Sequence, residues 1–165
     1  MTISRNTINA IESFTGENDH IKFEIVPSAG GKIISIYNKQ LQKEFLWINK
    51  NLQLDVRCYG ADYDSNFYGG IDELLPNDIP ENIDGVDYPD HGELWATCLD
   101  HELKEDSVTV SGKLKRSGLY YKKTMRLDAK EPVIYLEYKI RNEADFQRNF
   151  LWKLHAALIL KKVIS

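Results

Sequence analysis

The sequence has few cysteines and no spacing typical of metal ligands. Its two cysteines, Cys58 and Cys98, are too few for a disulfide framework, and neither belongs to a C-x-x-C pair. The four histidines show no H-x-H or H-x-x-x-H spacing. We therefore expect two reduced, partly buried thiols, and the sequence predicts neither a metal nor any other cofactor.

Long apolar runs and basic clusters are also missing. No stretch approaches the roughly 18 apolar residues of a membrane-spanning helix, and residues 1–14 lack the apolar centre of a signal peptide. The formal net charge is -4, and the basic residues form short pairs such as Lys122-Lys123 instead of a stripe. We therefore expect no nucleic-acid partner, no membrane association and a cytoplasmic location.

Alternating apolar and polar residues predict strands along most of this chain, whose 165 residues suffice for one domain. Residues 21–26 and 32–37 have the pattern of a hairpin around a glycine pair. Short antiparallel strands at regular spacing favour an all-β fold, an antiparallel β-sandwich. Its later strands are expected at residues 93–102, 107–114, 119–127, 133–140 and 150–159.

Residues 59–90 differ from the rest, because they contain prolines, glycine pairs and many aspartates but little periodicity. Long segments of this kind are uncommon in compact domains and are usually functional. Apolar residues such as Phe67 and Leu74 would anchor the segment. We predict a long ordered loop that forms one wall of a binding site, and the alternative is a mobile surface excursion.

Residues 89–95 lead out of this loop and carry the first candidate site. Alternation would place His91, Glu93 and Trp95 on one face of a strand. An imidazole, a carboxylate and an aromatic platform on one face suit a polar, ring-shaped ligand such as a sugar. The second candidate, His155, lies in the apolar segment 150–159, where a histidine is more often a hydrogen-bonded core residue than a catalyst.

Four stretches taken together resemble the galactose mutarotase (aldose 1-epimerase) superfamily. Each is weak alone, but their order and spacing extend over most of the chain, which argues against chance similarity. They are GGKIIS at 30–35 with FLW at 45–47, GIDELLPN at 70–77, PDHGELW at 89–95 and FLWKLHAA at 150–157.

The resemblance implies a supersandwich with an open sugar cleft, and an enzyme that binds an aldose and interconverts its anomers. In that chemistry a carboxylate takes the proton of the anomeric hydroxyl while a histidine protonates the ring oxygen. By position, His155 matches the general-acid histidine, His91 the histidine near the ring oxygen, and Asn77 a sugar-binding asparagine. Trp95 would stack on an apolar sugar face or be buried as a structural residue. Glu93 would bind a sugar hydroxyl or be a solvated strand residue.

The chain departs from the galactose-specific pattern, because Asp78 stands where an arginine is usual and Ala156-Ala157 where an aromatic pair is usual. The resemblance therefore implies a divergent branch with another aldose as ligand. Superfamily members run on for roughly another hundred residues, since sandwiches of this kind commonly have about 200–250, and the general base lies in that part. Residues 1–165 are thus identified as one N-terminal portion of such a domain, with exposed sheet edges through which we expect self-association.

Two other hypotheses stay open from the sequence. The first is a non-catalytic carbohydrate-binding β-sandwich module that keeps the cleft without turnover. The second is a structural β-domain without a sugar ligand, in which His91 and His155 are hydrogen-bonded core or loop residues.

Overall fold

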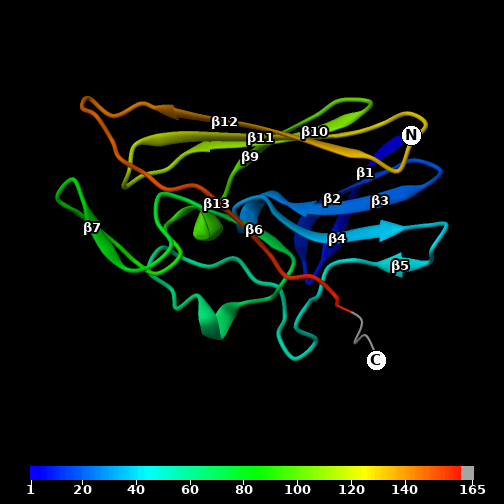
Figure 1. Cartoon of the computed structure of the whole chain (residues 1–165), viewed down its shortest axis with the longest axis horizontal. Helices are drawn as coiled ribbons and strands as arrows, with labels where there is room; N and C mark the ends of the chain where they lie inside the picture. The colour runs from blue at the N-terminus through cyan, green and yellow to red at the C-terminus, as the bar shows by residue number, and fades with distance from the viewer. Residues whose placement is uncertain (161–165) are drawn as a thin grey trace.

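The structure is a computed structural model that describes residues 1–160, and its regular elements are strands and three short 3-10 helices. Two antiparallel sheets lie face to face (Figure 1). The first has the strand order β1-β2-β3-β4-β6-β13, with β5 paired to β4. Its strands are β1 (Thr2–Ile8), β2 (Ile11–Glu17), β3 (Ile21–Val26), β4 (Lys32–Asn38), β5 (Lys43–Glu44), β6 (Ile71–Leu74) and β13 (Lys153–Ala156).

The second sheet has the order β12-β11-β10-β9, and a separate hairpin of β7 and β8 extends from one end of the molecule. Three 3-10 helices, η1, η2 and η3, connect the strands. The bounds are β7 (Glu81–Ile83), β8 (Val86–Tyr88), β9 (Asp100–Leu103), β10 (Ser107–Lys113), β11 (Leu119–Leu127), β12 (Ile134–Asn142), η1 (Pro27–Ala29), η2 (Asp64–Asn66) and η3 (Leu94–Ala96).

The core lies between the two sheets and takes apolar side chains from both. Phe14 and Phe23 of the first sheet and Val108 and Met125 of the second are fully buried in one cluster. Along β11, buried positions alternate with less buried ones, as expected for a strand with one face on the core. The predicted all-β fold, an antiparallel β-sandwich, is therefore confirmed.

Several predicted elements are confirmed, and the clearest are those with strict alternation. The hairpin predicted around the glycine pair is β3 and β4, which pair antiparallel around η1. The three strands expected between residues 107 and 140 are β10, β11 and β12, each within two residues of its predicted bounds. In β11 and β12 the more buried positions alternate with more exposed ones, because one face of each strand lies on the core.

The segment predicted as a long loop contains three strands, β6, β7 and β8, and the 3-10 helix η2. β6 is buried at all four positions, so it has no alternation of apolar and polar residues to reveal it. It pairs with β13 on one side and contacts β4 on the other. The two N-terminal strands, β1 and β2, were also not expected from the sequence, since β1 is a mostly exposed edge strand.

The strand expected over residues 93–102 is wrong in its first half. The chain turns at His91 and Gly92, which have φ values of 62° and 72°, and continues as the 3-10 helix η3. Only β9 pairs as a strand there. His91, Glu93 and Trp95 therefore do not share a strand face.

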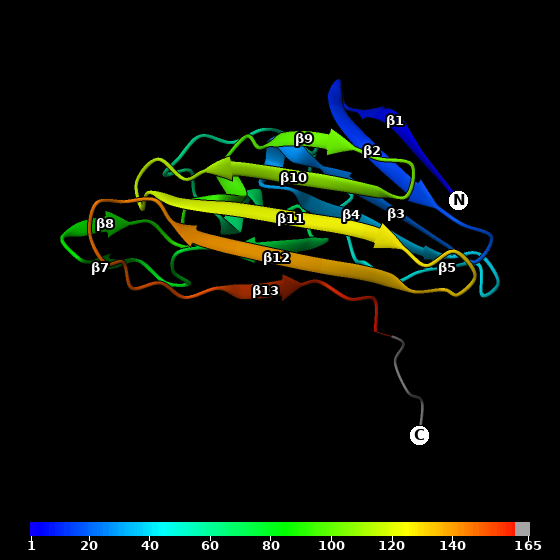
Figure 2. The same cartoon turned by 90° about the horizontal axis from the view of Figure 1, so that it is seen from above.

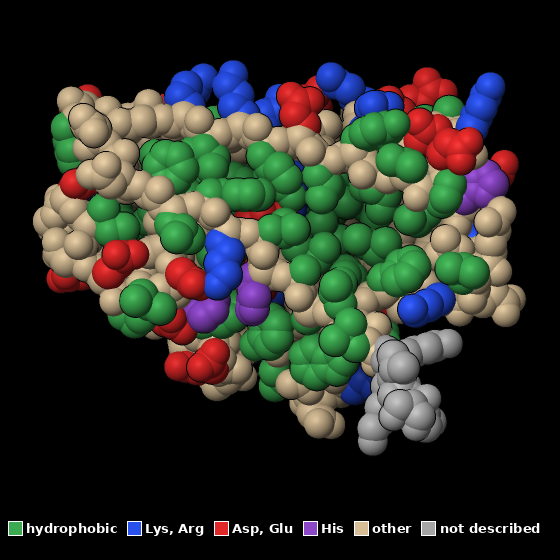
Figure 3. Space-filling model, in the orientation of Figure 1, with side chains coloured by type: hydrophobic (Ala, Val, Ile, Leu, Met, Phe, Trp, Pro, Cys, Tyr) green, Lys and Arg blue, Asp and Glu red, His purple; other side chains and the backbone are tan. Residues whose placement is uncertain are grey.

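β12 and β13 are edge strands of their sheets and lie on the same side of the sandwich in Figure 2. The ring centroids of Tyr138, in β12, and Trp152, just before β13, are 4.9 Å apart. Figure 3 shows a broad hydrophobic surface over the middle of the molecule. We call the exposed apolar residues of the C-terminal segment the apolar edge: Phe146, Phe150, Leu151, Trp152, Leu154, Leu158, Ile159 and Leu160.

Two smaller expectations concern the membrane and the thiols. Within residues 1–160, no helix has the length and apolar character needed to cross a bilayer. Cys58 and Cys98 are free, as expected, but both are exposed and not partly buried.

Candidate functional site

The candidate site lies where β6 and β13 pair. In their antiparallel register, Asp72 is opposite His155. Because successive residues of a strand face opposite ways, Asp72 points to the outer face of the sheet while Glu73 points into the sandwich. The outer face also receives Lys32 from β4 and Tyr63 from the segment before η2.

A continuous chain of polar contacts connects these residues to His155. The ammonium group of Lys32 donates to the Asp72 carboxylate and, at 3.1 Å, to the carbonyl of Gly69. The Tyr63 hydroxyl donates to Asp72 Oδ2 at 2.8 Å and lies 2.9 Å from Nδ1 of His155. Lys32, Asp72 and Tyr63 are all at least nine-tenths buried. Burial of an ion pair with further hydrogen bonds fixes the geometry of its members.

These hydrogen bonds determine the tautomer of His155. The Tyr63 hydroxyl has one hydrogen, and Asp72 accepts it. The contact between Tyr63 and His155 then requires Nδ1 of the imidazole to be the donor. In neutral His155, Nε2 therefore carries the free lone pair, and in the imidazolium it carries the second proton. The ring is oriented to take up or release a proton at Nε2.

Burial shifts the pKa values of both His155 and Tyr63. It lowers the pKa of His155 below the ordinary value of 6.5, while the negative charge of Asp72 acts in the opposite direction. Burial, together with the charge of Asp72, raises the pKa of Tyr63 far above its ordinary range. Tyr63 therefore keeps its hydroxyl proton at physiological pH.

His91 stacks on Tyr63 in this site. The ring centroids are 3.7 Å apart and the planes differ by 8°. The His91 amide donates to the carbonyl of Asp78 at 2.9 Å, which holds the backbone in a left-handed conformation. Asp90 Oδ2 is 2.8 Å from His91 Nδ1 but is not aligned for a hydrogen bond. A strained, fully supported residue of this kind is typical of functional sites.

Gly92 is the residue that lets the chain turn beneath His91. A Cβ atom at this position would lie 2.5 Å from the carbonyl oxygen of Leu75, which is closer than real contacts allow. Its φ of 72° also favours glycine. Glycine is thus required at this position by a close approach of two backbone segments.

The two predicted histidines come together at the surface. The ring centroids of His91 and His155 are 5.6 Å apart, and that of Phe67 is 5.2 Å from that of His155. Figure 3 shows adjacent histidine side chains on this face, with acidic side chains and a basic one beside them. We call Tyr63, Phe67, His91 and His155 the histidine cluster. At its border, Lys153 donates to Asp78 at 2.7 Å, and this contact lowers the pKa of Asp78.

Asn77 has a different position from the one that the resemblance implies for a sugar-binding residue. Its side chain is fully buried, and Nδ2 donates to the carbonyls of Ile79 and Pro89 at 2.7 and 2.8 Å. These bonds close the loop that carries the β7–β8 hairpin. Asn77 therefore positions the segment leading to His91 from beneath it.

Glu93 is neither free to bind a sugar hydroxyl nor solvated. It is 3% exposed, and its two carboxylate oxygens accept the backbone amides of Arg116 and Ser117 at 3.0 and 2.9 Å. Both of the roles expected for it from the sequence are corrected by this burial. Glu93 anchors the turn between β10 and β11.

Trp95 is buried in η3, where its ring meets Tyr63 edge to face at 5.0 Å. Leu74 belongs to the same apolar cluster. A ring enclosed in this way offers no free face to a sugar. Of the two roles expected from the sequence, the geometry favours the structural one, because Trp95 supports the ring on which His91 stacks.

On the inner face of β6, Glu73 forms a buried ion pair with Lys123 of β11. Both side chains are fully buried, and the shortest distance between Nζ and the carboxylate is 2.8 Å. The Tyr138 hydroxyl donates to Glu73 at 2.8 Å, and burial, with the Glu73 charge, raises the pKa of Tyr138. This pair connects the two sheets directly behind the histidine cluster.

The sequence reasoning missed Lys32, Tyr63 and Asp72 as members of the site. Lys32 and Asp72 each follow a glycine pair, at Gly30-Gly31 and Gly69-Gly70, within or beside the stretches that carry the resemblance. That shared context is the only signal that singles them out. Nothing local marks Tyr63.

Comparisons with known proteins bear on the fold. No family model matches the sequence, and no curated protein matches it. Among solved structures, a TPR-domain containing protein from Parabacteroides distasonis matches 78% of this chain with a TM-score of 0.56 and 18% identity. The protein HI1317 matches 76% of this chain with a TM-score of 0.49 and 15% identity. The matches span 20% and 47% of those longer proteins, and the first one supports the sandwich fold alone.

Proposed function

We propose that this chain binds an aldose at the histidine cluster and that His155 exchanges a proton with the sugar during interconversion of its anomers. The observation that carries the proposal is the meeting of His91 and His155, which come from distant segments and lie 5.6 Å apart at the surface. The ion pair of Lys153 with Asp78 and the ring of Phe67 border them. Such a combination suits a ligand that carries hydroxyl groups on a ring with an apolar face.

The chemistry follows from the oriented imidazole. Ring opening breaks the bond between the anomeric carbon and the ring oxygen, removes a proton from the anomeric hydroxyl and adds one to the ring oxygen. The imidazolium of His155 would supply, from Nε2, the proton that is added to the ring oxygen, because Nδ1 is held by Tyr63. A positioned acid of this kind contributes about 10²–10⁴ in rate.

The proton of the anomeric hydroxyl would have to pass to a carboxylate. That of Asp72 is buried, and its Oδ2 already accepts from both Lys32 and the Tyr63 hydroxyl. Asp78 is paired with Lys153. These contacts favour a second candidate function, a non-catalytic sugar-binding module, for the part of the chain that the structure describes.

Exchange spectroscopy tests the enzymatic proposal. We would measure proton NMR exchange between the α and β anomers of glucose and of galactose with the whole chain, with His155→Ala and with His20→Ala. Within residues 1–160 the His20 ring hydrogen-bonds only to Gln40, in a distant turn, so its variant is a matched control. Exchange above the buffer rate that disappears only in His155→Ala supports the enzyme. Equal exchange in all three proteins would contradict it.

Binding without turnover needs its own measurement. Sugar titrations followed by saturation-transfer NMR would show contact with the chain even when the anomers do not exchange. Binding that is lost in His91→Ala but kept in His20→Ala would support the module. Absence of both binding and exchange for these aldoses would leave the structural hypothesis as the better description.

A further inference from the structure

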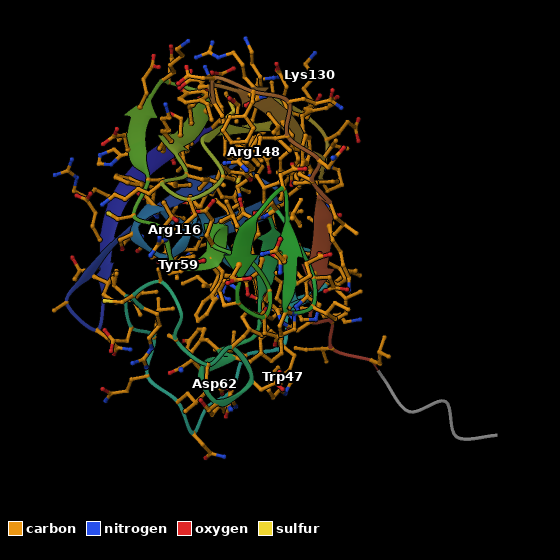
Figure 4. The ribbon with its side chains drawn as sticks, turned by 90° about the vertical axis from the view of Figure 1, so that its left-hand side faces the viewer. Trp47, Tyr59, Asp62, Arg116, Lys130 and Arg148 are labelled. Atoms are coloured by element: carbon orange, nitrogen blue, oxygen red, sulfur yellow. The ribbon has the colours of Figure 1, made fainter. Side chains whose placement is uncertain are left out.

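A recess lies at the end of the molecule that Figure 4 faces, between residues 56–59 and the turn after β10. Its volume is about 650 Å³, within the range of small-molecule sites. It shares no side chain with the histidine cluster. We call it the basic pocket, because four cationic side chains line it: Arg57, Lys113, Lys115 and Arg116.

The one acidic side chain in this lining does not face the recess as a free charge. Glu93 is buried, and both of its oxygens accept backbone amides of the turn that carries Lys115 and Arg116. Its negative charge is thus used to hold that turn in place. The side chains that remain exposed around the opening include Lys113, Lys115 and Arg116.

Two of the four cations have no acidic partner. Arg57 pairs with Asp55 at 3.1 Å, and Lys113 lies 4.0 Å from Glu143. Lys115 and Arg116 form no ion pair with any residue between 1 and 160. The chain as a whole has a net charge of -4, so two adjacent cations without acidic partners make this recess more positive than the rest of the protein.

Arg116 is also held in position before any ligand arrives. Its guanidinium lies 5.1 Å from the centre of the Tyr59 ring, and Figure 4 shows the two residues next to each other. The Tyr59 hydroxyl donates to the carbonyl of Asp87 at 3.0 Å, and Arg148 Nε donates to the carbonyl of Ser117 at 2.9 Å. A cation that is already ordered loses less entropy when it binds an anion.

We propose that the basic pocket binds a small organic phosphate monoester. A dianionic phosphate matches the two unpaired cations, and arginine recognises phosphate through paired donors. Val56, Tyr59 and Ala96 add apolar surface to the same wall, which suits the organic part of the ligand. This site is separate from the histidine cluster, and the inference does not depend on sugar binding there.

The test is a titration of the whole chain with phenyl phosphate at low salt, followed by two-dimensional amide NMR. We expect saturable shifts in residues 56–59 and 113–117. The double variant Lys115→Glu/Arg116→Glu should weaken the affinity about tenfold or more, because two attractive charges become repulsive. The matched control is Lys130→Glu, an exposed lysine far from the pocket in Figure 4, which should change the affinity less than about twofold at this distance.

Three further measurements test phosphate binding at the basic pocket. Lys115→Glu alone leaves the Arg116–Tyr59 contact intact and should weaken binding to a smaller extent, which separates charge from any loss of folding. Phenyl phosphate should slow thiol labelling of Cys58 and Cys98, which line the pocket. Phenol should bind much more weakly than phenyl phosphate. Equal weakening by Lys130→Glu, equal binding of phenol, or the absence of saturable shifts would each overturn the proposal.

Discussion

The ring of Tyr63 stacks on His91 at 3.7 Å, while its hydroxyl oxygen lies 2.9 Å from Nδ1 of His155. One buried side chain therefore positions both candidate histidines, one through its face and the other through its edge. Lys32 and Asp72 hold the hydroxyl in turn. The geometry of the site depends on a residue that no ligand needs to touch.

Tyr63→Phe separates the two roles, because it keeps the ring and removes the hydroxyl. We expect the free energy of unfolding to fall by about 1–3 kcal/mol, since buried groups of Asp72 and His155 lose a partner. Urea unfolding measures this. Tyr135→Phe, which removes an exposed hydroxyl 3.2 Å from Asp128, is the control and should cost less than about 0.5 kcal/mol. Equal losses in the two variants would contradict the role of Tyr63.

His155 gives the stability a dependence on pH. Because its pKa in the folded chain lies below 6.5, the unfolded chain binds more protons between these two values. The free energy of unfolding should therefore rise with pH through this window and fall as the solution is acidified. Above pH 6.5 the contribution of His155 is fully present.

Urea unfolding over a pH series measures this slope. His155→Gln removes this titrating group and should flatten the curve below pH 6.5 relative to the unchanged chain. If the His155→Gln curve keeps the original slope, another group carries the dependence. The carboxyls of Asp78 and Glu17, whose pKa values are lowered by lysine partners, act only at lower pH.

The ion pair of Glu73 and Lys123 should be sensitive to the loss of either partner. Glu73→Gln leaves a buried ammonium group without its countercharge, and we expect a loss of about 3–5 kcal/mol. The double variant Glu73→Leu/Lys123→Met removes both charges and should recover most of that loss. Thermal or urea unfolding of the three proteins measures this. A double variant less stable than Glu73→Gln would show that the pair itself stabilises the sandwich.

Gly92→Ala tests the close approach of two backbone segments beneath His91. The added Cβ would meet the Leu75 carbonyl at 2.5 Å, so the turn must move or the fold must loosen. We expect a cost of more than about 1 kcal/mol and shifted amide signals at His91. Gly85→Ala is the control, because it has a similar positive φ of 77° and no atom within 4 Å of the added Cβ. Equal effects would assign the cost to φ alone.

The apolar edge should cause the chain to associate with itself, as expected from the sequence. Exposed apolar residues beside an unpaired strand favour pairing with a second copy. Sedimentation velocity over a concentration series should show species larger than the monomer. Leu154→Lys, on β13, should shift the distribution to the monomer, while Leu41→Lys, on an exposed turn with 65% of the leucine accessible, should not. A monomer at all concentrations contradicts this expectation.

The sequence predicted those parts of the fold in which one face of a strand is buried and the other is exposed. β11 and β12 have this pattern, and the alternation of all three strands from β10 to β12 was visible in the sequence. β6 was hidden because all of its residues are buried, and η3 was mistaken for a strand because alternation continues for a few residues beyond the turn at Gly92.

The site was predictable only in part, and for a similar reason. His91 was singled out by the pattern of residues 89–95 and by resemblance, and His155 by resemblance; their meeting depends on the pairing of β6 and β13, which no local pattern encodes. Asn77, Glu93 and Trp95 were predicted to bind the sugar, but the sequence could not show that they are buried. Tyr63 was missed because its partners are distant along the chain.

The adjacent carboxylates of Asp72 and Glu73 have a consequence for how such a protein can change over time. Neighbouring positions on β6 serve two tasks, so insertion or deletion of one residue would shift each of these side chains to the opposite face of the sheet. An insertion before Ile71 would leave Lys32 facing Ile71, and deletion of Ile71 would leave Lys123 facing Leu74, so in either case one lysine loses its countercharge. Length changes in this short strand are thus expected to be strongly destabilising.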